Sequence, residues 1–187
     1  MNYYGSKELA QSFRTVRKNT LTIADEIQED RYGFEPAPGC RSVAEALSHI
    51  ALSSRLHHQF HGLEHHTSLE SFDYRAFVAR MQVEEKRPRS KSEVLELLRS
   101  EGERFAAWLD GLSDEFPAEQ VAMPEGAIPQ SKSRFEMILS VKEHEMHHRG
   151  QLMLVERMLG IVPHLTREMQ ARFAAAPPAA AGAQKTS

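Results

Sequence analysis

Apolar positions recur every three or four residues over four long stretches of the chain, and this spacing predicts four amphipathic helices. The first is expected from Ser6 to Glu29, with its recurring positions at Leu9, Phe13, Val16, Thr20, Ile23 and Ile27. A segment rich in glycine and proline follows, at Gly33, Pro36, Pro38 and Gly39. Because these residues disfavour a helix interior, we expect the first helix to end before them.

Each of the other three long helices is predicted to begin at a serine that precedes a glutamate by three positions. In this capping-box pattern the serine oxygen accepts from a free backbone amide and the glutamate reaches back to the cap. The pairs are Ser42 with Glu45, Ser90 with Glu93, and Ser133 with Glu136. We expect the second helix to continue to about His61 and the third through Leu109. The last should end at Gly160, since glycine commonly terminates helices.

The remaining segments are less regular. Asp73 to Glu85 predicts a short extra helix between the second and third long helices, and three prolines with a glycine predict an irregular connection from Pro117 to Gln130. No strand-like alternation persists, so the predicted fold class is all-α, a four-helix bundle over residues 1–173. Residues 174–187 offer almost nothing to bury, and we expect a disordered Ala/Pro-rich tail there.

Composition narrows the possible partners and compartments. A chain of 187 residues suits one domain, and a net charge of −3 provides no electrostatic footprint for nucleic acid or an anionic membrane. The single cysteine, Cys40, excludes an intrachain disulfide and fits a reducing compartment. Neither a signal-peptide pattern nor an apolar run of about 20 residues is present. We therefore expect a cytoplasmic protein that acts on small molecules.

Histidine is the residue type that indicates chemistry: nine of the ten histidines lie between His49 and His148. His144 and His148 are four residues apart, so their rings project from one face of a helix, as a chelating pair requires. They share a stripe with Met137, Val141, Gln151, Val155 and Leu159. We expect that stripe to face inward. A metal ion would satisfy both rings, whereas the alternative is a solvated histidine-rich turn.

His49, in the second long helix, is the candidate for a third ligand. Bundles assemble metal sites from side chains on facing helices, and three protein ligands leave a coordination position open for catalysis. By itself, a histidine near an apolar stripe is more often a hydrogen-bonded core residue. The predicted metal site is therefore His49, His144 and His148, with no catalytic base assigned.

Two other interpretations involve the histidines. His144 to His148 also matches the His-Glu-x-x-His pattern, in which Glu145 would be the general base of a zinc protease. That interpretation is weak, because Leu154 stands where the extended motif has a third histidine and only Glu168 would remain as a third ligand. Separately, the spacing of His57, His61 and His65 allows a second metal site, although a solvated helix end is the simpler explanation.

The residues from Arg41 to Ile50, taken with His144 to Leu152, resemble the DinB/YfiT-like metalloenzyme superfamily. Its pattern is a histidine in the middle of the second helix and a late His-x-x-x-His-Arg-Gly-Gln run, and the resemblance extends from about Tyr4 to Arg172. It implies that His49, His144 and His148 are the metal ligands. Arg149, Gly150 and Gln151 match the trailing residues, with a role in packing or in supporting the ligands. One departure is Cys40-Arg41, where many members have a tryptophan before the serine.

The expected function follows from the metal. Three neutral imidazoles leave the two charges of a divalent ion uncompensated, and such an ion lowers the pKa of bound water to about 7 or ionises a thiol. The resemblance implies both uses, in thiol-dependent S-transferases and in metal-dependent hydrolases, and also implies a homodimer. We expect an enzyme that activates a low-molecular-weight thiol, or water. The alternative is a non-catalytic, metal-binding stress-response bundle. Zinc or nickel is the expected metal, with iron or manganese as alternatives.

Overall fold

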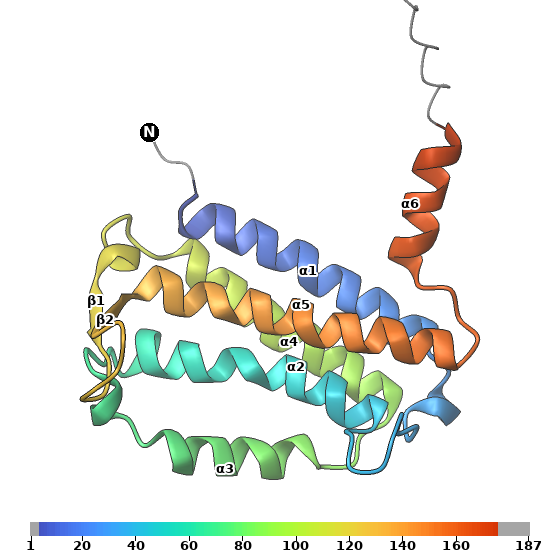
Figure 1. Cartoon of the computed structure of the whole chain (residues 1–187), viewed down its shortest axis with the longest axis horizontal. Coiled ribbons are helices and arrows are strands. Elements are labelled where there is room, and N and C mark those ends of the chain that lie inside the picture. The colour runs from blue at the N-terminus through green and yellow to red at the C-terminus, as the bar shows by residue number, and fades with distance from the viewer. Residues whose placement is uncertain (1–3, 176–187) are drawn as a thin grey trace, which may run out of the picture.

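A computed structural model describes residues 4–175, which form six α-helices and one small antiparallel sheet (Figure 1). The helices are α1 (Ser6–Glu26), α2 (Val43–His57), α3 (Tyr74–Glu85), α4 (Lys91–Asp110), α5 (Arg134–Met158) and α6 (His164–Ala175). The strands are β1 (Gln120–Ala122) and β2 (Ser131–Ser133). Short 3-10 turns lie at Glu29–Arg31, Leu69–Ser71 and Phe116–Ala118, and a π-helical turn, His58–Leu63, extends α2.

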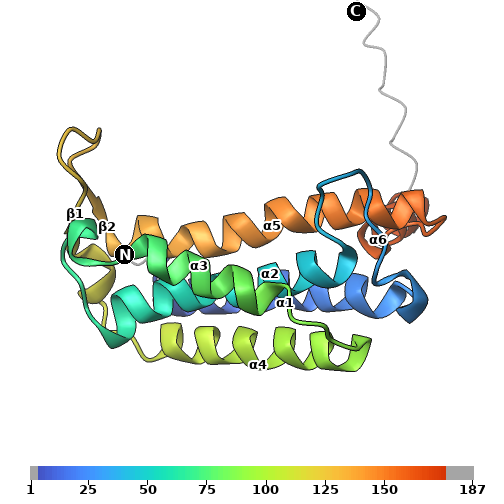
Figure 2. The same ribbon diagram turned by 90° about the horizontal axis from the view of Figure 1, so that it is seen from below.

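The four long helices α1, α2, α4 and α5 lie side by side as a bundle, which confirms the predicted fold class (Figures 1 and 2). Helix α1 packs against α4 and α5, and α2 packs against the same two helices. Helices α1 and α2 therefore occupy opposite corners of the bundle, although they are consecutive in the chain. This arrangement places α2 beside α5, so that the histidines of the two helices can meet.

The bundle core consists of two apolar clusters with a buried ion pair in α1 and α5 as its main polar element. One cluster joins α1, α2, α4 and α5 around Ile23, Leu47, Ile50 and Leu98; the other joins α1, α4 and α5 around Phe13, Phe105 and Ile138. The pair is formed by Arg17 and Glu145, with Nε of Arg17 2.9 Å from Oε1 of Glu145. Both side chains are almost completely shielded from solvent.

The helix starts agree with the capping residues expected from the sequence. Ser42, Ser90 and Ser133 are the N-caps of α2, α4 and α5, and each side chain accepts from the backbone amide three residues on. At Ser42 and Ser90 the glutamate also returns a bond to the cap, which completes the capping box. These caps fix the register of the helices that carry the histidines.

Three segments differ from the expectation: the end of α1, the connection before α5, and α6. Helix α1 ends at Glu26, because Ile27 adopts an extended conformation before the 3-10 turn. The connection before α5 contains a hairpin, in which Val121 of β1 pairs with Lys132 of β2. Strands of three residues are too short for alternation to reveal them.

Helix α6 was not expected from the sequence, and its apolar side chains Met169 and Phe173 are exposed. A helix that buries so little gives a weak amphipathic signal. It includes Ala174 and Ala175, the first two residues of the predicted tail, and the rest of that tail lies outside the described residues. No helix of the described part of the chain is long and apolar enough to cross a membrane.

The expected short helix is α3, and it lies outside the four-helix arrangement, packed against α2 (Figures 1 and 2). Asp73 caps its start by accepting from the amide of Ala76. Phe77 is the apolar side chain that α3 buries completely. Because α3 lies over the side of α2 that adjoins α5, it encloses a pocket beside the histidines.

Candidate metal centre

The three histidines expected as ligands come together between α2 and α5. Nε2 of His144 lies 3.1 Å from Nε2 of His49 and 3.1 Å from Nε2 of His148. Nitrogens bound to one zinc ion at about 2.0–2.1 Å would lie about 3.3 Å apart in tetrahedral geometry. The spacing of these ring nitrogens therefore suits a single metal ion, and all three rings are half-buried.

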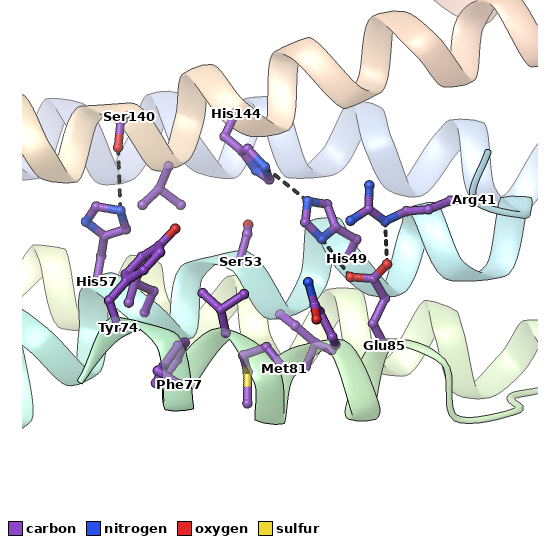
Figure 3. A pocket seen from close by; sticks show the side chains of 15 residues that line it. Arg41, His49, Ser53, His57, Tyr74, Phe77, Met81, Glu85, Ser140 and His144 are labelled. Carbon is purple, nitrogen blue, oxygen red and sulfur yellow. Dashed lines mark hydrogen bonds and ion pairs between the residues drawn. The ribbon is translucent and has the colours of Figure 1, made fainter. Parts of the chain in front are cut away.

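Hydrogen bonds behind the rings determine which nitrogens are free. Nδ1 of His49 lies 2.8 Å from a carboxylate oxygen of Glu85, an atom that can only accept, so the proton of His49 is on Nδ1 (Figure 3). Nδ1 of His148 lies 2.8 Å from Oε1 of Gln151, whose amide nitrogen contacts His147. With the amide of Gln151 in this orientation, His148 is also protonated on Nδ1. Both rings present a bare Nε2 to His144.

His144 cannot satisfy both neighbours. A neutral ring carries one proton, so its Nε2 can donate to one of the two bare nitrogens at most. If the proton is on Nε2, the buried Nδ1 is an acceptor, and no described group hydrogen bonds to it. At least two neighbouring ring nitrogens then face each other with their lone pairs and no proton between them. A cation at the centre of the three nitrogens would remove this conflict.

Burial and nearby charges keep the rings of His144 and His148 neutral. Burial, together with charge repulsion from the nearby His148, His49, His147 and Arg41, lowers the pKa of His144 to about 4. Burial also lowers the pKa of His148, against an opposing hydrogen bond to Gln151. Neutral imidazole is the form that binds metal, so these two rings are ready to bind at neutral pH.

Glu85, the last residue of α3, ties that helix to the histidines. One carboxylate oxygen accepts from His49 and the other accepts from Nε of Arg41 (Figure 3). Burial raises the pKa of Glu85, but the hydrogen bonds from His49 and Arg41 outweigh burial and hold the pKa below its ordinary value. The carboxyl is therefore ionised at neutral pH, as in the carboxylate–histidine–metal arrangements of many metal sites.

A pocket of about 360 Å³ opens beside the histidines, between α2, α3 and α5 (Figure 3). His49 and His144 belong to its wall at one end, and His57 with Ser140 to its wall at the other. Between them the lining is mainly apolar: Leu52, Leu56, Phe77, Val78, Met81 and Val141. Its size and lining are those of a site for a small organic molecule.

The inward face of α5 agrees only in part with the face expected from the sequence. Val141 and Val155 are buried as expected. Around the histidines, however, the buried positions are Glu145 and Leu152, one residue beyond His144 and Gln151; Gln151 is exposed, and His144 and His148 are half-buried. A step of one residue turns a helix by about 100°, which moves the two histidines from the core to the flank beside α2. His144 lines the pocket, and His148 lies beside it one turn further along α5.

Glu145 does not act on the histidine site. Its carboxylate is completely buried and accepts from Arg17 and, at 2.8 Å, from Thr20. The glutamate of a His-Glu-x-x-His protease must face the metal-bound water, whereas Glu145 points into the core of the bundle. The protease interpretation is therefore wrong.

Comparison with known proteins identifies the family. A sequence profile of the DinB family matches residues 1–180. The chain belongs to the DinB family. The uncharacterized protein YjoA of Bacillus subtilis (strain 168) is 23% identical over 155 residues, which cover 83% of this chain and 91% of YjoA. The family assignment agrees with the resemblance noted in the sequence.

Solved structures of DinB-like proteins share the fold. The crystal structure of YjoA from Bacillus subtilis matches with 20% identity and a TM-score of 0.59, and the match covers 82% of this chain and 92% of the YjoA chain. A DinB-like protein from Bacillus cereus ATCC 10987 gives 18% identity and a TM-score of 0.61, with coverage of 83% and 93%. YfiT from Bacillus subtilis is described as a probable metal-dependent hydrolase with an unusual four-helix bundle topology. It gives 17% identity and a TM-score of 0.62, with coverage of 83% and 88%.

The second histidine group of this DinB-family chain does not converge. Nδ1 of His61 accepts from Arg134, and Nε2 of His65 lies beside Glu119. Nε2 of His57 instead faces Ser140, at 3.5 Å. Within residues 4–175, the potential ligand atoms that cluster closely belong to His49, His144 and His148.

Gln151 and Glu85 both support ligands of the DinB site, but only Gln151 was expected from the sequence. Gln151 was expected to pack or support the ligands, and it does hydrogen bond to His148. Gly150, from the same run, is exposed with open space around it, so packing does not require a glycine there. Glu85 was missed. A carboxylate behind a metal-binding histidine is common, but only the placement of α3 selects Glu85 among the acidic residues.

Proposed function

We propose that this DinB-family protein is a metal-dependent enzyme whose divalent ion is held by His49, His144 and His148. The observation that carries the proposal is that Nε2 of His144 lies 3.1 Å from Nε2 of both His49 and His148, with too few protons to pair the three nitrogens. The fixed Nδ1 protons of His49 and His148 support it, because they direct the lone pairs of both rings toward the same point.

The proposed reaction begins at a coordination position that the protein leaves open. In the described part of the chain three side chains form the group, and catalytic zinc sites commonly have three protein ligands and one exchangeable position. When bound, the ion would supply a Lewis acid that ionises a small thiol or water. Glu85 and Gln151 would hold two rings in place, and the apolar walls of the pocket would exclude bulk water from the substrate.

Thiol activation is our first assignment within this proposal, as in the thiol-dependent transferases that the family resemblance implies. A site with no anionic protein ligand suits a thiolate, because its charge offsets part of the charge of the ion. Hydrolysis by activated water is the second candidate, and the description of YfiT as a probable metal-dependent hydrolase favours it. A non-catalytic metal-binding role is the third.

Metal binding is tested by elemental analysis of protein purified without a histidine tag. We expect about one equivalent of metal in the wild type and none after His144→Ala or His148→Ala, because two imidazoles chelate too weakly. His147→Ala is the matched control: it is exposed on the same turn and should retain the metal. Loss of metal from His147→Ala together with retention in His148→Ala would refute the assigned ligands.

The chemistry is tested with cobalt-substituted protein. Cysteine or glutathione should change the visible spectrum, because sulfur would enter the coordination sphere of the ion. A screen of those thiols against small electrophiles would then identify the transfer reaction. A spectrum that does not respond to millimolar thiol would overturn the thiol assignment, and ester or amide hydrolysis without thiol would establish the second candidate.

A further inference from the structure

Arg41 brings a fixed positive charge to the end of the pocket that holds the histidines. Among the described residues that line the pocket, it is the one arginine or lysine. Its Nε donates to Glu85, whose other oxygen accepts from His49, so the guanidinium is anchored beside that ring (Figure 3).

The terminal nitrogens of Arg41 are available to a ligand. Within residues 4–175, the hydrogen bond of its side chain to the protein is made by Nε, and Nη1 and Nη2 find no acceptor. The side chain is 41% exposed and therefore accessible from the pocket and solvent. A guanidinium presents paired donors that match the two oxygens of a carboxylate.

Next to this charged end, the pocket has an elongated apolar part, which we call the apolar channel. It follows α2 from His49 to His57, a distance of about 12 Å at 1.5 Å per residue. Leu52 and Leu56 of α2 form one side, and Phe77, Val78 and Met81 of α3 form the other. The apolar channel suits a ligand with a hydrocarbon or aromatic group that extends from a single anionic group.

We propose that the pocket binds a small, mainly apolar carboxylic acid, with its carboxylate on the terminal nitrogens of Arg41 and its body between α2 and α3. That this acid is a substrate rests on the proposed function. The inference deepens that function by naming the substrate class. It also indicates that the reacting bond lies near the carboxylate, since Arg41 and the histidines share one end of the pocket. Binding itself requires no metal.

The test measures binding of octanoate and octanamide to metal-free protein by titration calorimetry. The two probes share a chain and differ in charge. We expect octanoate to bind roughly tenfold to hundredfold more tightly, the range for a hydrogen bond to a charged group. Arg41→Gln should reduce octanoate binding to the level of octanamide without changing octanamide binding. Arg41→Lys should bind octanoate with intermediate affinity, because lysine keeps the charge but lacks the paired N–H donors of arginine.

Control variants show where the probe binds. Arg75→Gln removes an exposed arginine of α3 that does not line the pocket, and should leave both affinities unchanged. Met81→Trp should block the apolar channel and abolish binding of both probes. Circular dichroism would confirm that each variant is folded. Equal affinity for the two probes, or octanoate binding that is unaffected in Arg41→Gln, overturns the inference.

Failure of this inference can be distinguished from failure of the proposed function. His144→Ala should lose metal yet still bind octanoate through Arg41. If octanoate does not bind while the wild type holds one metal ion, the substrate class is wrong and the metal proposal stands. If octanoate binds but no metal does, the pocket is a carboxylate site and the proposed metal chemistry fails.

Discussion

At the scale of single residues, the positions of protons decide whether the three histidines can bind a cation. The sequence predicted the histidines because their spacing places them on helix faces, and spacing is visible in one chain. It could not predict which ring nitrogen is free, because that depends on Glu85 and Gln151. Glu85 is remote from the histidines in sequence and reaches His49 only through the packing of α3 on α2.

Glu85→Leu should weaken metal binding about tenfold to hundredfold, the usual cost of removing the partner behind a metal-binding histidine. Without the carboxylate, the proton of His49 is no longer held on Nδ1 and the ring can rotate. Glu85→Gln should have a smaller effect, because its carbonyl oxygen can still accept from Nδ1. Competition with a chromophoric chelator measures the affinity. Glu84→Leu is the control, since Glu84 contacts Arg89 and no histidine; unchanged affinity in Glu85→Leu would contradict the role.

His57, at the far end of the pocket, and His61, stacked on it, should make the metal-free protein sensitive to acid. Burial lowers the pKa of His57 to about 4, and burial with nearby positive charges lowers that of His61 to about 3. Between these values and about 6.5, the unfolded chain binds protons that the folded chain does not. The free energy of unfolding should therefore fall as the pH falls from about 6.5 towards 4.

Urea unfolding at pH 7 and pH 5, in the presence of chelator, measures this loss. Glu156 acts in the opposite direction, because burial and the charge of Glu26 raise its pKa to about 7, and protonation then favours the folded state as the pH falls. A comparison of variants isolates the histidine contribution. His57→Gln should lose less stability on acidification than the wild type, whereas the exposed control His147→Ala should behave as the wild type does. Identical losses in His57→Gln and wild type would refute the expectation.

At the scale of elements, the predicted helices were those that bury a wide apolar stripe and begin at a capping serine. Helices α2 and α4 met both conditions, and their starts agree with the structure. Helix α6 and the hairpin met neither, because α6 leaves Met169 and Phe173 exposed and the strands span three residues each. Around the histidines, the inward face of α5 was placed one residue too early, although Val141 and Val155 are buried as expected. A charged residue, Glu145, occupies the core-facing position, and hydrophobic periodicity cannot recognise such a residue as buried.

The pair of Arg17 and Glu145, which joins α1 to α5, should be costly to break from one side. Glu145→Ala should lower the free energy of unfolding by about 3–5 kcal/mol, because it leaves the buried charge of Arg17 without its partner. The double variant Arg17→Met/Glu145→Leu should recover most of that loss, since it removes both charges. Urea unfolding of the single and double variants measures the coupling.

The control for this pair is Glu103→Ala. Glu103 also pairs with an arginine of α1, Arg14, but its side chain is 65% exposed. Exposed pairs contribute about 0–1 kcal/mol, so the variant should unfold nearly as the wild type does. An equally small effect of Glu145→Ala would contradict the assignment of a buried ion pair.

At the scale of the whole molecule, the bundle has what it needs to fold without metal. Its two apolar clusters and the buried pair lie in the interior of the four helices, and the histidines lie on the flank. Chelator should therefore lower the melting temperature through loss of ligand binding to the folded state, while the helical circular dichroism at 25 °C is retained. A collapse of helicity in chelator would show that the histidine site is structural.

The homodimer implied by the family resemblance stays a prediction. Met146, Leu154 and Met158 are exposed at intervals of four or eight residues, with Gly150 between them, and form one apolar stripe on α5. If two copies meet through this stripe, Leu154→Glu should convert the dimer to a monomer in light scattering after size-exclusion chromatography. Val83→Glu, at an exposed apolar position of α3, is the control. A monomeric wild type would refute the dimer, and a dimeric Leu154→Glu variant would exclude the stripe.

The outlying position of α3 has a consequence for how such a protein can evolve. This helix of 12 residues supplies one wall of the pocket but packs mainly against a single neighbour, and it gives the histidine site only Glu85. Mutations at Val78 or Met81 would reshape the pocket without disturbing the packing of the four long helices. Selection could therefore exchange one accepted molecule for another while the metal-binding helices remain under constraint. Directed evolution confined to α3 would be the economical route to a new substrate.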